Sequence, residues 1–325
     1  MFSRIARGAA WAVCASLSLW AVAALAFDVR IPWLRTPLAL GYLAGVVLVY
    51  VRLRPRARAH ATTVAGFLFV LAWWRSLEPS NDRDWQPDVA VLPRADPDGE
   101  RVTIHGIRNC LYRSETDYDV RHYDKTFDLA KLATVDLFLV YWGSPSIAHT
   151  MVSFGFGDDG YVCVSIETRK EKGEAYSAVR GFFRQFELVY VVADERDLVK
   201  VRTDFRHEDV YLYRLKVTPG VARGLFLEYM NRVDALYETP RWYNAATSNC
   251  TTNIRDHARL YAEDPRSDWR FLVNGYLDRM LYERGRIDTS LPFEATRERA
   301  HVNPLARAAG SADDFSERIR AGLGD

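Results

Sequence analysis

The sequence predicts an α+β domain preceded by a helical membrane region. The basic and acidic residues are unevenly distributed: nine of 43 basic and two of 42 acidic residues lie in the first 80 positions, so this segment carries +7 and the remainder −6. The same 80 residues contain three uncharged apolar runs. The remainder shows strand-like segments first and helix-like segments afterwards, which is typical of the α+β class.

The three apolar runs are predicted to form a membrane anchor. Gly8–Phe27 has 20 residues and, at about 1.5 Å per residue, reaches across a hydrocarbon core roughly 30 Å thick. Pro37–Val51 and Ala59–Trp74 have 15 and 16 residues and reach about 22–24 Å, so flanking arginines would have to extend to the membrane surface. Residues 1–78 are therefore predicted to contain about three transmembrane helices. The alternative for the two shorter runs is a buried helix pair in a soluble core.

The arginines indicate how this anchor is oriented. Arg4 and Arg7 precede the first run, and four arginines fill the loop between the second and third: Arg52, Arg54, Arg56 and Arg58. Positive residues concentrate on the cytoplasmic side, so three crossings place everything after Trp74 outside the cytoplasm. As an alternative, Ala24-Leu25-Ala26 fits a signal-peptide cleavage site. The arginine-rich loop also fits nucleic-acid binding, but its position between apolar runs disfavours this, and we predict no nucleic-acid partner.

Residues 79–100 are predicted to form a linker. The stretch is polar and contains Pro87, Pro93 and Pro97 among several aspartates. This composition is typical of a tether that follows the last membrane segment. The main domain is then expected over 101–285, and 286–325 is a weakly patterned C-terminal tail whose role stays open.

The main domain contains six strand-like segments followed by helix-like ones. Dense or alternating apolar residues identify the strands: 102–107, 135–142, 148–156, 161–168, 188–193 and 210–217. Gly157-Asp158-Asp159-Gly160 is a hairpin signal between the third and fourth strands. Thr218-Pro219 starts a helix that runs to about 237, with Thr as N-cap and Pro in the first turn. Further helices are expected over about 250–261 and over 268–283.

One cysteine has the surroundings of a reactive thiol. Cys250 follows Thr247-Ser248-Asn249, three good capping residues, so it lies at or next to a helix N-terminus. Unpaired N–H groups and the helix dipole lower the pKa of a thiol there, and the thiolate is the reactive form. The same N–H groups could bind the oxyanion of an acyl-transfer reaction, and we expect Asn249 and Thr251 to contribute to substrate binding. The alternative is a buried structural cysteine beside a helix cap.

A nucleophilic cysteine needs a base. His257 lies seven residues further along the same helix, about 10.5 Å away, which is too far for a hydrogen bond, so we interpret it as a surface or helix-face residue. His149 is preferred because it begins the strand 148–156, which holds a base rigidly. Glu167 in the partner strand could orient its imidazole and fix the tautomer. The alternative for His149 is a satisfied core histidine.

Two basic residues after Glu167 are candidates for substrate binding. Arg169 and Lys170 could bind an anionic headgroup or a carboxylate, or they could form a solvated turn. The sequence has no CxxC, HExxH, Walker motif or GxGxxG, so neither a metal nor a cofactor is predicted. Cys110 and Cys163 could form a disulfide in an oxidising compartment, or either could be a buried free thiol.

Several of these segments together resemble a known family. The segments HTMVSFGF (149–156), SIETRK (165–170) and NCTTNIR (249–255), with GEAYSAVRGFF (173–183) and ELVYVVADERD (187–197) between them, resemble the Lnb N-terminal periplasmic domain family. The family has long been catalogued as a domain of unknown function. The resemblance covers roughly residues 105–260, about half the chain. Its motifs are fairly specific because both their order and their spacing agree.

The resemblance implies a fold and a set of roles. A strand with His149 lies 101 residues before a helix with Cys250, which reverses the papain order and is similar to circularly permuted NlpC/P60-type thiol enzymes. The expected fold class is therefore α+β, with a circularly permuted papain-like (NlpC/P60-like) domain after an N-terminal transmembrane region. In that scheme Cys250 is the nucleophile, His149 the base and Glu167 the orienting residue.

The resemblance also implies a substrate class and a location. The family's namesakes are lipoprotein intramolecular transacylases, which move an acyl chain from a lipid-modified N-terminal cysteine to its own amine. The chain is thus expected to be a bacterial inner-membrane protein whose periplasmic thiol acyltransferase or hydrolase acts on a membrane lipid or lipoprotein. Unlike in the namesakes, its apolar segments all precede the domain, so the substrate does not transfer directly. A cell-envelope cysteine peptidase or amidase and a non-catalytic scaffold remain alternatives, and the oligomeric state stays open.

Overall fold

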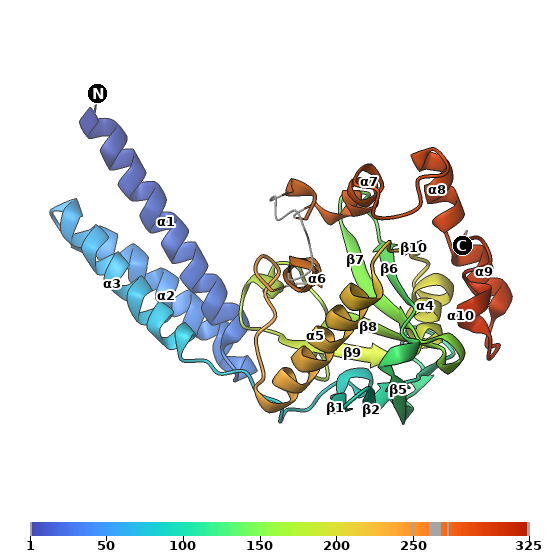
Figure 1. Cartoon of the computed structure of the whole chain (residues 1–325). Coiled ribbons are helices and arrows are strands. Elements are labelled where there is room, and N and C mark those ends of the chain that lie inside the picture. The colour runs from blue at the N-terminus through green and yellow to red at the C-terminus, as the bar shows by residue number, and fades with distance from the viewer. Residues whose placement is uncertain (1, 249, 260–267, 272, 324–325) are drawn as a thin grey trace. The chain divides into compact units, whose positions relative to one another are not determined.

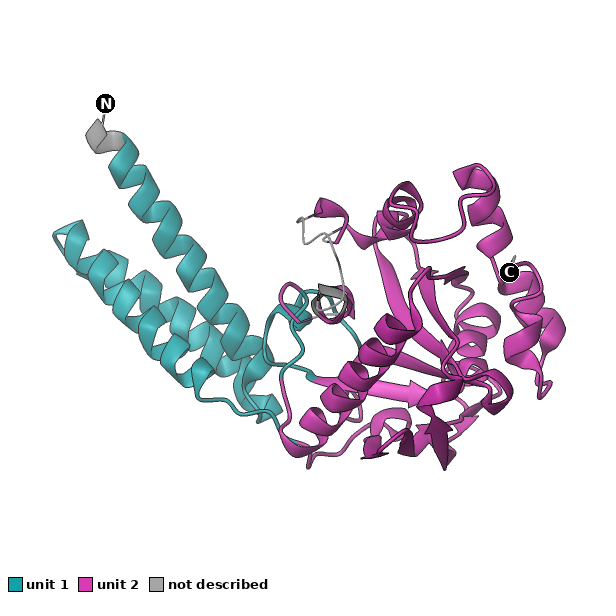
Figure 2. Ribbon diagram, viewed as in Figure 1, with its two compact units in different colours: residues 1–80, 175–187, 242–245 teal, residues 81–174, 188–241, 246–325 magenta. Residues whose placement is uncertain are grey.

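The computed structural model describes residues 2–248, 250–259, 268–271 and 273–323. The chain divides into two compact units, shown in teal and magenta in Figure 2. The first unit consists of residues 1–80, 175–187 and 242–245, and the second of residues 81–174, 188–241 and 246–325. Long helices dominate the first unit, and a mixed sheet dominates the second.

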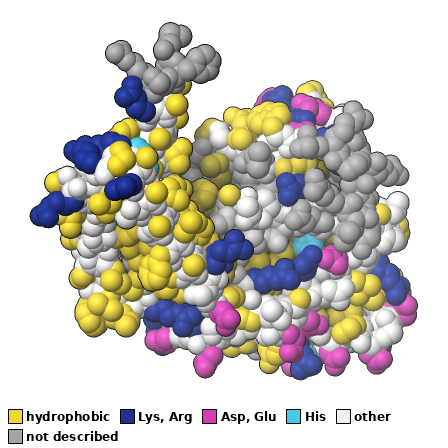
Figure 3. Space-filling model, turned by 90° about the vertical axis from the view of Figure 1, so that its left-hand side faces the viewer, with side chains coloured by type: hydrophobic (Ala, Val, Ile, Leu, Met, Phe, Trp, Pro, Cys, Tyr) yellow, Lys and Arg dark blue, Asp and Glu magenta, His cyan; other side chains and the backbone are white. Residues whose placement is uncertain are grey.

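The apolar runs form long helices, as the sequence predicts: α1 (Phe2–Asp28), α2 (Pro32–Arg52) and α3 (Arg56–Arg75) (Figure 1). Pro32 lies in the first turn of α2, where a missing backbone N–H costs nothing. Hydrophobic side chains cover much of this helical unit in the view of Figure 3. Leu19, Trp33 and Phe69 are each more than 70% exposed. Such large apolar side chains on an outer helix surface fit a lipid environment.

Two of these helices satisfy the length and composition of a membrane span. Among the described residues they are the segments Ile5–Asp28 of α1 and Pro32–Arg52 of α2. The third helix, α3, has 20 residues, but its first turns carry Arg56, Arg58 and His60. A membrane-compatible N-terminal region is thus confirmed, whereas the third crossing by α3 stays a prediction.

An eight-stranded sheet forms the centre of the second unit among the residues that the structure describes. The strand order is β1-β2-β9-β8-β7-β6-β10, and β5 also pairs with β2. The strands of this sheet are β1 (Arg94–Asp98), β2 (Arg101–Arg108), β5 (His122–Asp128), β6 (Thr134–Tyr141), β7 (Ala148–Gly155), β8 (Tyr161–Arg169), β9 (Glu187–Ala193) and β10 (Asp209–Arg214). A separate small ribbon joins β3 (Leu111–Tyr112) to β4 (Tyr118–Asp119). All six predicted strands form, and four are additional: β1 and β5 in the sheet and β3 and β4 in the ribbon.

Helices pack on both faces of the sheet, and the α+β class is confirmed. They are α4 (Glu195–Lys200), α5 (Pro219–Glu238), α6 (Cys250–Arg259), α7 (Leu277–Glu283), α8 (Phe293–Ala300), α9 (Asn303–Ala309) and α10 (Phe315–Arg318). From α5, Phe226 and Tyr229 pack on Phe154 of β7, with ring centroids 5.2 and 5.6 Å apart. Side chains alternate between the two faces along a strand, so Met151, three residues before Phe154, faces the other side of the sheet. There it belongs to a second cluster with Ala306 and Phe315.

The predicted linker is a folded part of the second unit over residues 81–100. Trp85 and Val89 are 6% and 4% exposed, and residues 94–98 form strand β1. The backbone N–H of Gln86 donates to the carbonyl of Lys170 at 2.9 Å. Residues 81–100, which the sequence assigned to a linker, are therefore folded into the second unit, because two buried apolar residues lie within the polar composition.

The predicted C-terminal tail is also part of the core. Helices α9 and α10 contribute buried apolar residues to the cluster around Met151. The Arg320 guanidinium lies 2.8 Å from a carboxylate oxygen of Asp136 and 2.7 Å from one of Glu195, and both carboxylates are buried. Burying three charges requires that they pair, so this network fixes the C-terminal segment on the sheet.

Candidate functional site

The hairpin of β7 and β8 places three polar residues next to one another: His149 and Glu167, which the sequence predicted, and Ser165, which it did not. Met151 of β7 pairs with Ser165 of β8 in the antiparallel register. Residues two apart along a strand share a face, so His149 lies on the same face as Ser165 and Glu167. Gly157 and Gly160 adopt positive φ values of 56° and 75°, which lets the predicted turn between the strands form.

Hydrogen bonds connect these three side chains in sequence. The His149 Nε2 lies 2.8 Å from Ser165 Oγ, and the Ser165 hydroxyl donates to Glu167 Oε1 at 2.7 Å. The direct distance from His149 Nε2 to Glu167 Oε1 is 3.4 Å. Because the Ser165 hydroxyl uses its hydrogen in the bond to the Glu167 carboxylate, the Ser165 oxygen accepts the hydrogen bond from the Nε2–H of His149. This arrangement leaves Nδ1 as the ring nitrogen for a partner on the other side.

The carboxylate of Glu167 is held in place by Arg202. The Arg202 Nη2 donates to Glu167 Oε1 at 2.7 Å, and its Nη1 donates to the carbonyl of Leu198 at 2.8 Å. Burial raises the pKa of Glu167, but the positive charges of His149 and Arg202 outweigh it, so the pKa is lowered well below its ordinary value. Glu167 is therefore ionised across the neutral range.

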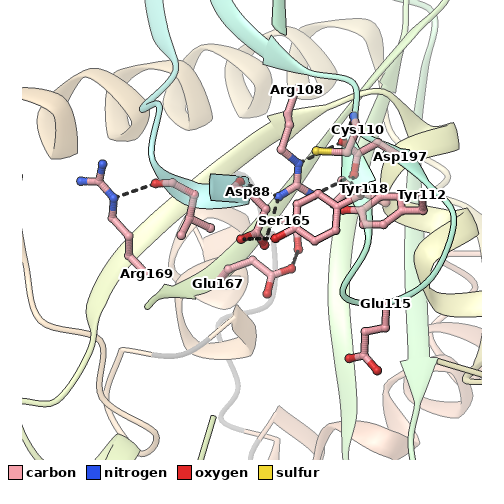
Figure 4. A network of polar contacts seen from close by, with 12 residues as sticks. Asp88, Arg108, Cys110, Tyr112, Glu115, Tyr118, Ser165, Glu167, Arg169 and Asp197 are labelled. Carbon is pink, nitrogen blue, oxygen red and sulfur yellow. Dashed lines mark hydrogen bonds and ion pairs between the residues drawn. The ribbon is translucent and has the colours of Figure 1, made fainter. Parts of the chain in front are cut away.

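The segment that bears Arg202 is itself anchored. Arg202 lies in a π-helical turn, Val201–Phe205, directly after α4. In α4, Asp197 accepts two hydrogen bonds from the Arg108 guanidinium, at 3.0 and 2.8 Å, and one from the backbone N–H of Cys110 at 2.7 Å. Figure 4 shows this buried network together with Ser165 and Glu167. A bidentate ion pair fixes orientation as well as distance, so α4 presents Arg202 in a defined position.

The Cys250 thiol is hydrogen-bonded to the imidazole of His149. Cys250 is the first residue of α6, which packs against β7 and β8. Burial raises the pKa of the thiol, but a hydrogen bond from the His149 imidazole, its charge, and hydrogen bonds from the backbone and side chain of Thr150 outweigh it, and the pKa falls to about 7. A free cysteine has a pKa of about 8.5, so the thiolate is stabilised at this position.

The imidazole of His149 shows the opposite shift. Burial lowers its pKa, whereas the Glu167 charge and the hydrogen bond to Cys250 raise it, and the result is a pKa of about 9. A thiol whose pKa lies below that of its imidazole partner transfers its proton to it. Between about pH 7 and 9 the pair therefore exists as a thiolate and an imidazolium, with the protons shared as one coupled system.

Asn274, which sequence reasoning missed, connects the two elements that carry the pair. Its side-chain oxygen accepts from the backbone N–H of Ala148 at 2.9 Å, and its Nδ2 donates to the Ala148 carbonyl and to the hydroxyl of Thr251. Ala148 directly precedes His149, and Thr251 directly follows Cys250. The next residue is Gly275, where a Cβ would lie 2.2 Å from the carbonyl oxygen of Pro145, so only glycine permits this close approach.

The other predicted substrate-binding residues have different roles or lie outside the described residues. Asn249 lies outside them. Thr251 is 3% exposed and bonded to Asn274. Arg169 is 2% exposed; it donates to the carbonyls of Val89 and Ala90 and to Asn81, and it stacks on Trp85. This burial contradicts a substrate-binding role for Arg169, because its guanidinium fastens residues 81–90. Lys170 is half-buried, and its proposed role stays a prediction.

His257 is a buried helix-face residue. Its Nε2 lies 2.9 Å from the Tyr190 hydroxyl, its ring packs on Tyr229, and it is 2% exposed. Of the two alternatives that the sequence left, a surface or a helix-face residue, the structure shows the second. Cys110 and Cys163 are free, buried thiols, and burial raises the pKa of Cys110 to about 12. Among the described residues, no group of three or more His, Cys, Asp or Glu side chains gathers as a metal site.

Comparison with known proteins identifies the family. Residues 118–275 match the model of the Lnb N-terminal periplasmic domain. This part of the chain belongs to that family. The matched residues, called the Lnb domain below, include His149, Ser165, Glu167, Cys250 and Asn274. No curated protein and no solved structure matches the chain.

Proposed function

We propose that the Lnb domain is a cysteine-dependent acyltransferase or hydrolase of the bacterial cell envelope. In this proposal Cys250 is the nucleophile and His149 the general acid and base. The observation that carries it is the hydrogen bond between the Cys250 thiol and the His149 imidazole. The pKa of the thiol is lowered and that of the imidazole is raised, so the thiolate and the imidazolium are both favoured. A purely structural scaffold would have no need of a stabilised thiolate, and perturbed titrating pairs are typical of functional sites. Ser165 and Glu167 act as positioning residues that fix the imidazole.

The chemistry follows from the positions of the protons. The thiolate attacks the carbonyl carbon of an ester or amide, forming a carbon–sulfur bond and a tetrahedral oxyanion. As the intermediate collapses, the imidazolium of His149 gives its proton to the departing oxygen or nitrogen, leaving an acyl thioester on Cys250. Water or an amine then attacks the thioester and gives its proton to His149, and the thiolate leaves. The N-terminus of α6 and the N–H of Thr150 are the candidate stabilisers of the oxyanion.

Exposed apolar side chains around the site favour an acyl chain as substrate. Trp142 and Ile147 lie in the turn between β6 and β7, and they are 43% and 53% exposed. Trp269 and Tyr276 flank Asn274 and are 61% and 37% exposed, with ring centroids 5.8 Å apart. The backbone N–H of Gly275 donates to the carbonyl of Ser146, which joins the two segments. Exposed apolar groups that cluster beside a reactive centre are typical of binding sites for apolar ligands.

The fold and location complete the proposal. The order of a histidine strand before a cysteine helix supports a circularly permuted papain-like arrangement. The family is described as periplasmic, and α1 and α2 are compatible with a membrane anchor, so we propose an inner-membrane protein whose Lnb domain works in the periplasm. A membrane lipid or lipoprotein would then be the substrate. The apolar surroundings favour it over the peptide substrate of a cell-wall peptidase or amidase.

The test is turnover by the full chain in lipid nanodiscs. Substrates would be a diacylated lipopeptide, a matched peptide without acyl chains and a cell-wall muropeptide, with products followed by mass spectrometry. We expect release or transfer of the acyl chain and no reaction with the other two compounds. Cys250→Ser and His149→Gln should abolish it, whereas the control Cys14→Ser, at a buried thiol of α1 in the first unit, should retain it.

Two outcomes would contradict the proposal. Acyl release that persists in Cys250→Ser would remove this cysteine from the reaction. Cleavage of the muropeptide with no reaction of the lipopeptide would assign the site to an amidase or peptidase.

A further inference from the structure

A loop of the Lnb domain packs against the membrane-compatible helices within the first compact unit. The loop comprises residues 175–187, between β8 and β9. Its Phe183 is 8% exposed and belongs to a cluster with Ala21 and Ala24 of α1 and Val70 of α3. Its ring also lies against Trp20 and Phe27, with centroids 5.9 and 5.3 Å away. The loop is therefore built onto the helices rather than merely adjacent to them.

The contacts of Phe183 define where along α1 the loop sits. Trp20 and Phe27 are seven residues apart, which is about 10.5 Å along a helix. A single ring that touches both must lie beside the last two turns of α1. These turns are part of the uncharged run Gly8–Phe27. The loop thus reaches the level of the apolar segment itself.

Polar contacts fix the loop at the same ends of α1 and α3. The backbone N–H of Arg184 donates to Asp28 Oδ2 at 3.2 Å, and the same oxygen accepts from Trp74 Nε1 at 2.6 Å. The Arg184 guanidinium donates to the carbonyls of Arg75 and Leu77 and lies 4.4 Å from the centre of the Trp74 ring. Arginine, tryptophan and a capped helix end are the groups that usually occupy the membrane–water interface.

Three large apolar residues of this loop are exposed. Tyr176, Val179 and Phe182 are 50%, 60% and 52% exposed. Arg180 lies among them, with its guanidinium 5.7 Å from the centre of the Phe27 ring. Exposed apolar residues scattered over a surface need no explanation, but three within seven residues on one loop do. They belong to the same short loop as Phe183 and Arg184, which contact the ends of α1 and α3.

We propose that residues 175–187 form an interfacial membrane-binding loop, with Tyr176, Val179 and Phe182 inserted among lipid headgroups and upper acyl chains. The occupant of this surface is the bilayer, because Phe183 and Arg184 of the same loop contact α1 and α3 at the ends of these apolar helices. Arg180 and Arg184 extend toward the phosphate level of the same leaflet. The inference rests on membrane anchoring by the N-terminal helices and is independent of the thiol chemistry.

The experiment uses photo-crosslinking in the full chain. Benzoylphenylalanine is incorporated separately at Val179 and Phe182, and the protein is reconstituted in nanodiscs of phosphatidylethanolamine and phosphatidylglycerol. Leu19, on the exposed surface of α1, is the positive control, and Leu291, an exposed apolar residue of the second unit, is the matched negative control. After irradiation, lipid adducts are quantified by intact-protein mass spectrometry.

We expect lipid adducts at positions 179 and 182 in yields close to that at 19, and none at 291. Yields at 179 and 182 as low as at 291 would overturn the proposal, and crosslinks to another protein instead of lipid would assign the surface to a protein partner. The rate of Cys250 alkylation in the same samples reports whether the thiol site is intact. A failure of the membrane loop is thereby distinguishable from a failure of the proposed acyl transfer.

Discussion

Replacing His149 with Gln should change the pH dependence of Cys250 reactivity in a characteristic way. In the native site the imidazole and Thr150 lower the pKa of the thiol to about 7 from a reference of 9.0, despite burial. Glutamine keeps the approximate volume but cannot carry the positive charge. With the charge gone and burial unchanged, the pKa of Cys250 should return to at least its reference value.

The size of the effect depends on pH. At pH 7 about half of a thiol with pKa 7 is ionised, against about 1% of a thiol with pKa 9, a roughly 50-fold difference. The less basic thiolate is intrinsically less nucleophilic by about 6- to 10-fold for two pKa units. The native site should therefore react about 5- to 8-fold faster at pH 7. Above about pH 8.2 the order reverses, because the native thiol is then almost fully ionised and gains no more rate, whereas the variant's thiolate is more nucleophilic and still increasing in amount.

The assay is the rate of iodoacetamide alkylation of Cys250 between pH 5 and 10, read by peptide mass spectrometry. The other cysteines, Cys14, Cys110 and Cys163, are buried and serve as internal references. A misfolded variant would react differently at all pH values without a crossing point. A native midpoint near pH 9, or identical profiles for the two proteins, would refute the coupling of Cys250 to His149.

Three further predictions concern the residues around the pair. Glu167→Gln should move the pKa of His149 down toward its ordinary value of 6.5, because the Glu167 charge is the largest cause that raises it; NMR titration of the imidazole would show this, and an unmoved midpoint would deny that role. Asn274→Ala should slow Cys250 alkylation at pH 7 and lower the free energy of unfolding by about 1–3 kcal/mol, since Ala148 and Thr251 lose a buried partner; unchanged values in both assays would contradict the clamp. Arg320→Met should cost about 3–5 kcal/mol in urea denaturation, because Asp136 and Glu195 remain buried without their cation; a loss below about 1 kcal/mol would show that the C-terminal segment is not fixed by this network.

The sequence predicts the central strands well because buried strands have locally recognisable runs of apolar residues. Strands β6, β7 and β9 are buried on both faces and read as dense apolar runs. Strand β1, at the edge of the sheet, is polar and has Ala95 as its buried residue. Such an edge strand forms because β2 offers it a partner, which no local pattern reveals.

The C-terminal helices escape prediction for a related reason. They are short, and their core residues Ala306, Phe315 and Ile319 are spread over separate turns. A helical period needs a window of about 11–18 residues to be recognised. Burial of Arg320 against acidic residues far along the chain completes the attachment and has no local signal either.

The candidate site is predictable only in part. Cys250 and His149 have recognisable neighbourhoods, a helix cap and a strand start, and Ser165 could have been found because it lies two residues before Glu167 on the same strand face. Arg202 and Asn274 reach the site from distant parts of the chain, so only the fold shows them. Arg169 was misread because a basic residue in a turn is usually solvated, whereas here residues 81–90 fold over it.

The most direct test of the central claim is to trap the acyl group on Cys250. The full chain in nanodiscs is mixed at pH 7 with a diacylated lipopeptide whose amine is blocked, quenched in acid, and mapped by peptide mass spectrometry. The account predicts an acyl group on the peptide that contains Cys250, released by hydroxylamine as a thioester is, and absent from Cys250→Ser. Product formation without any acyl group on Cys250, or an equal adduct in the serine variant at another residue, would contradict it.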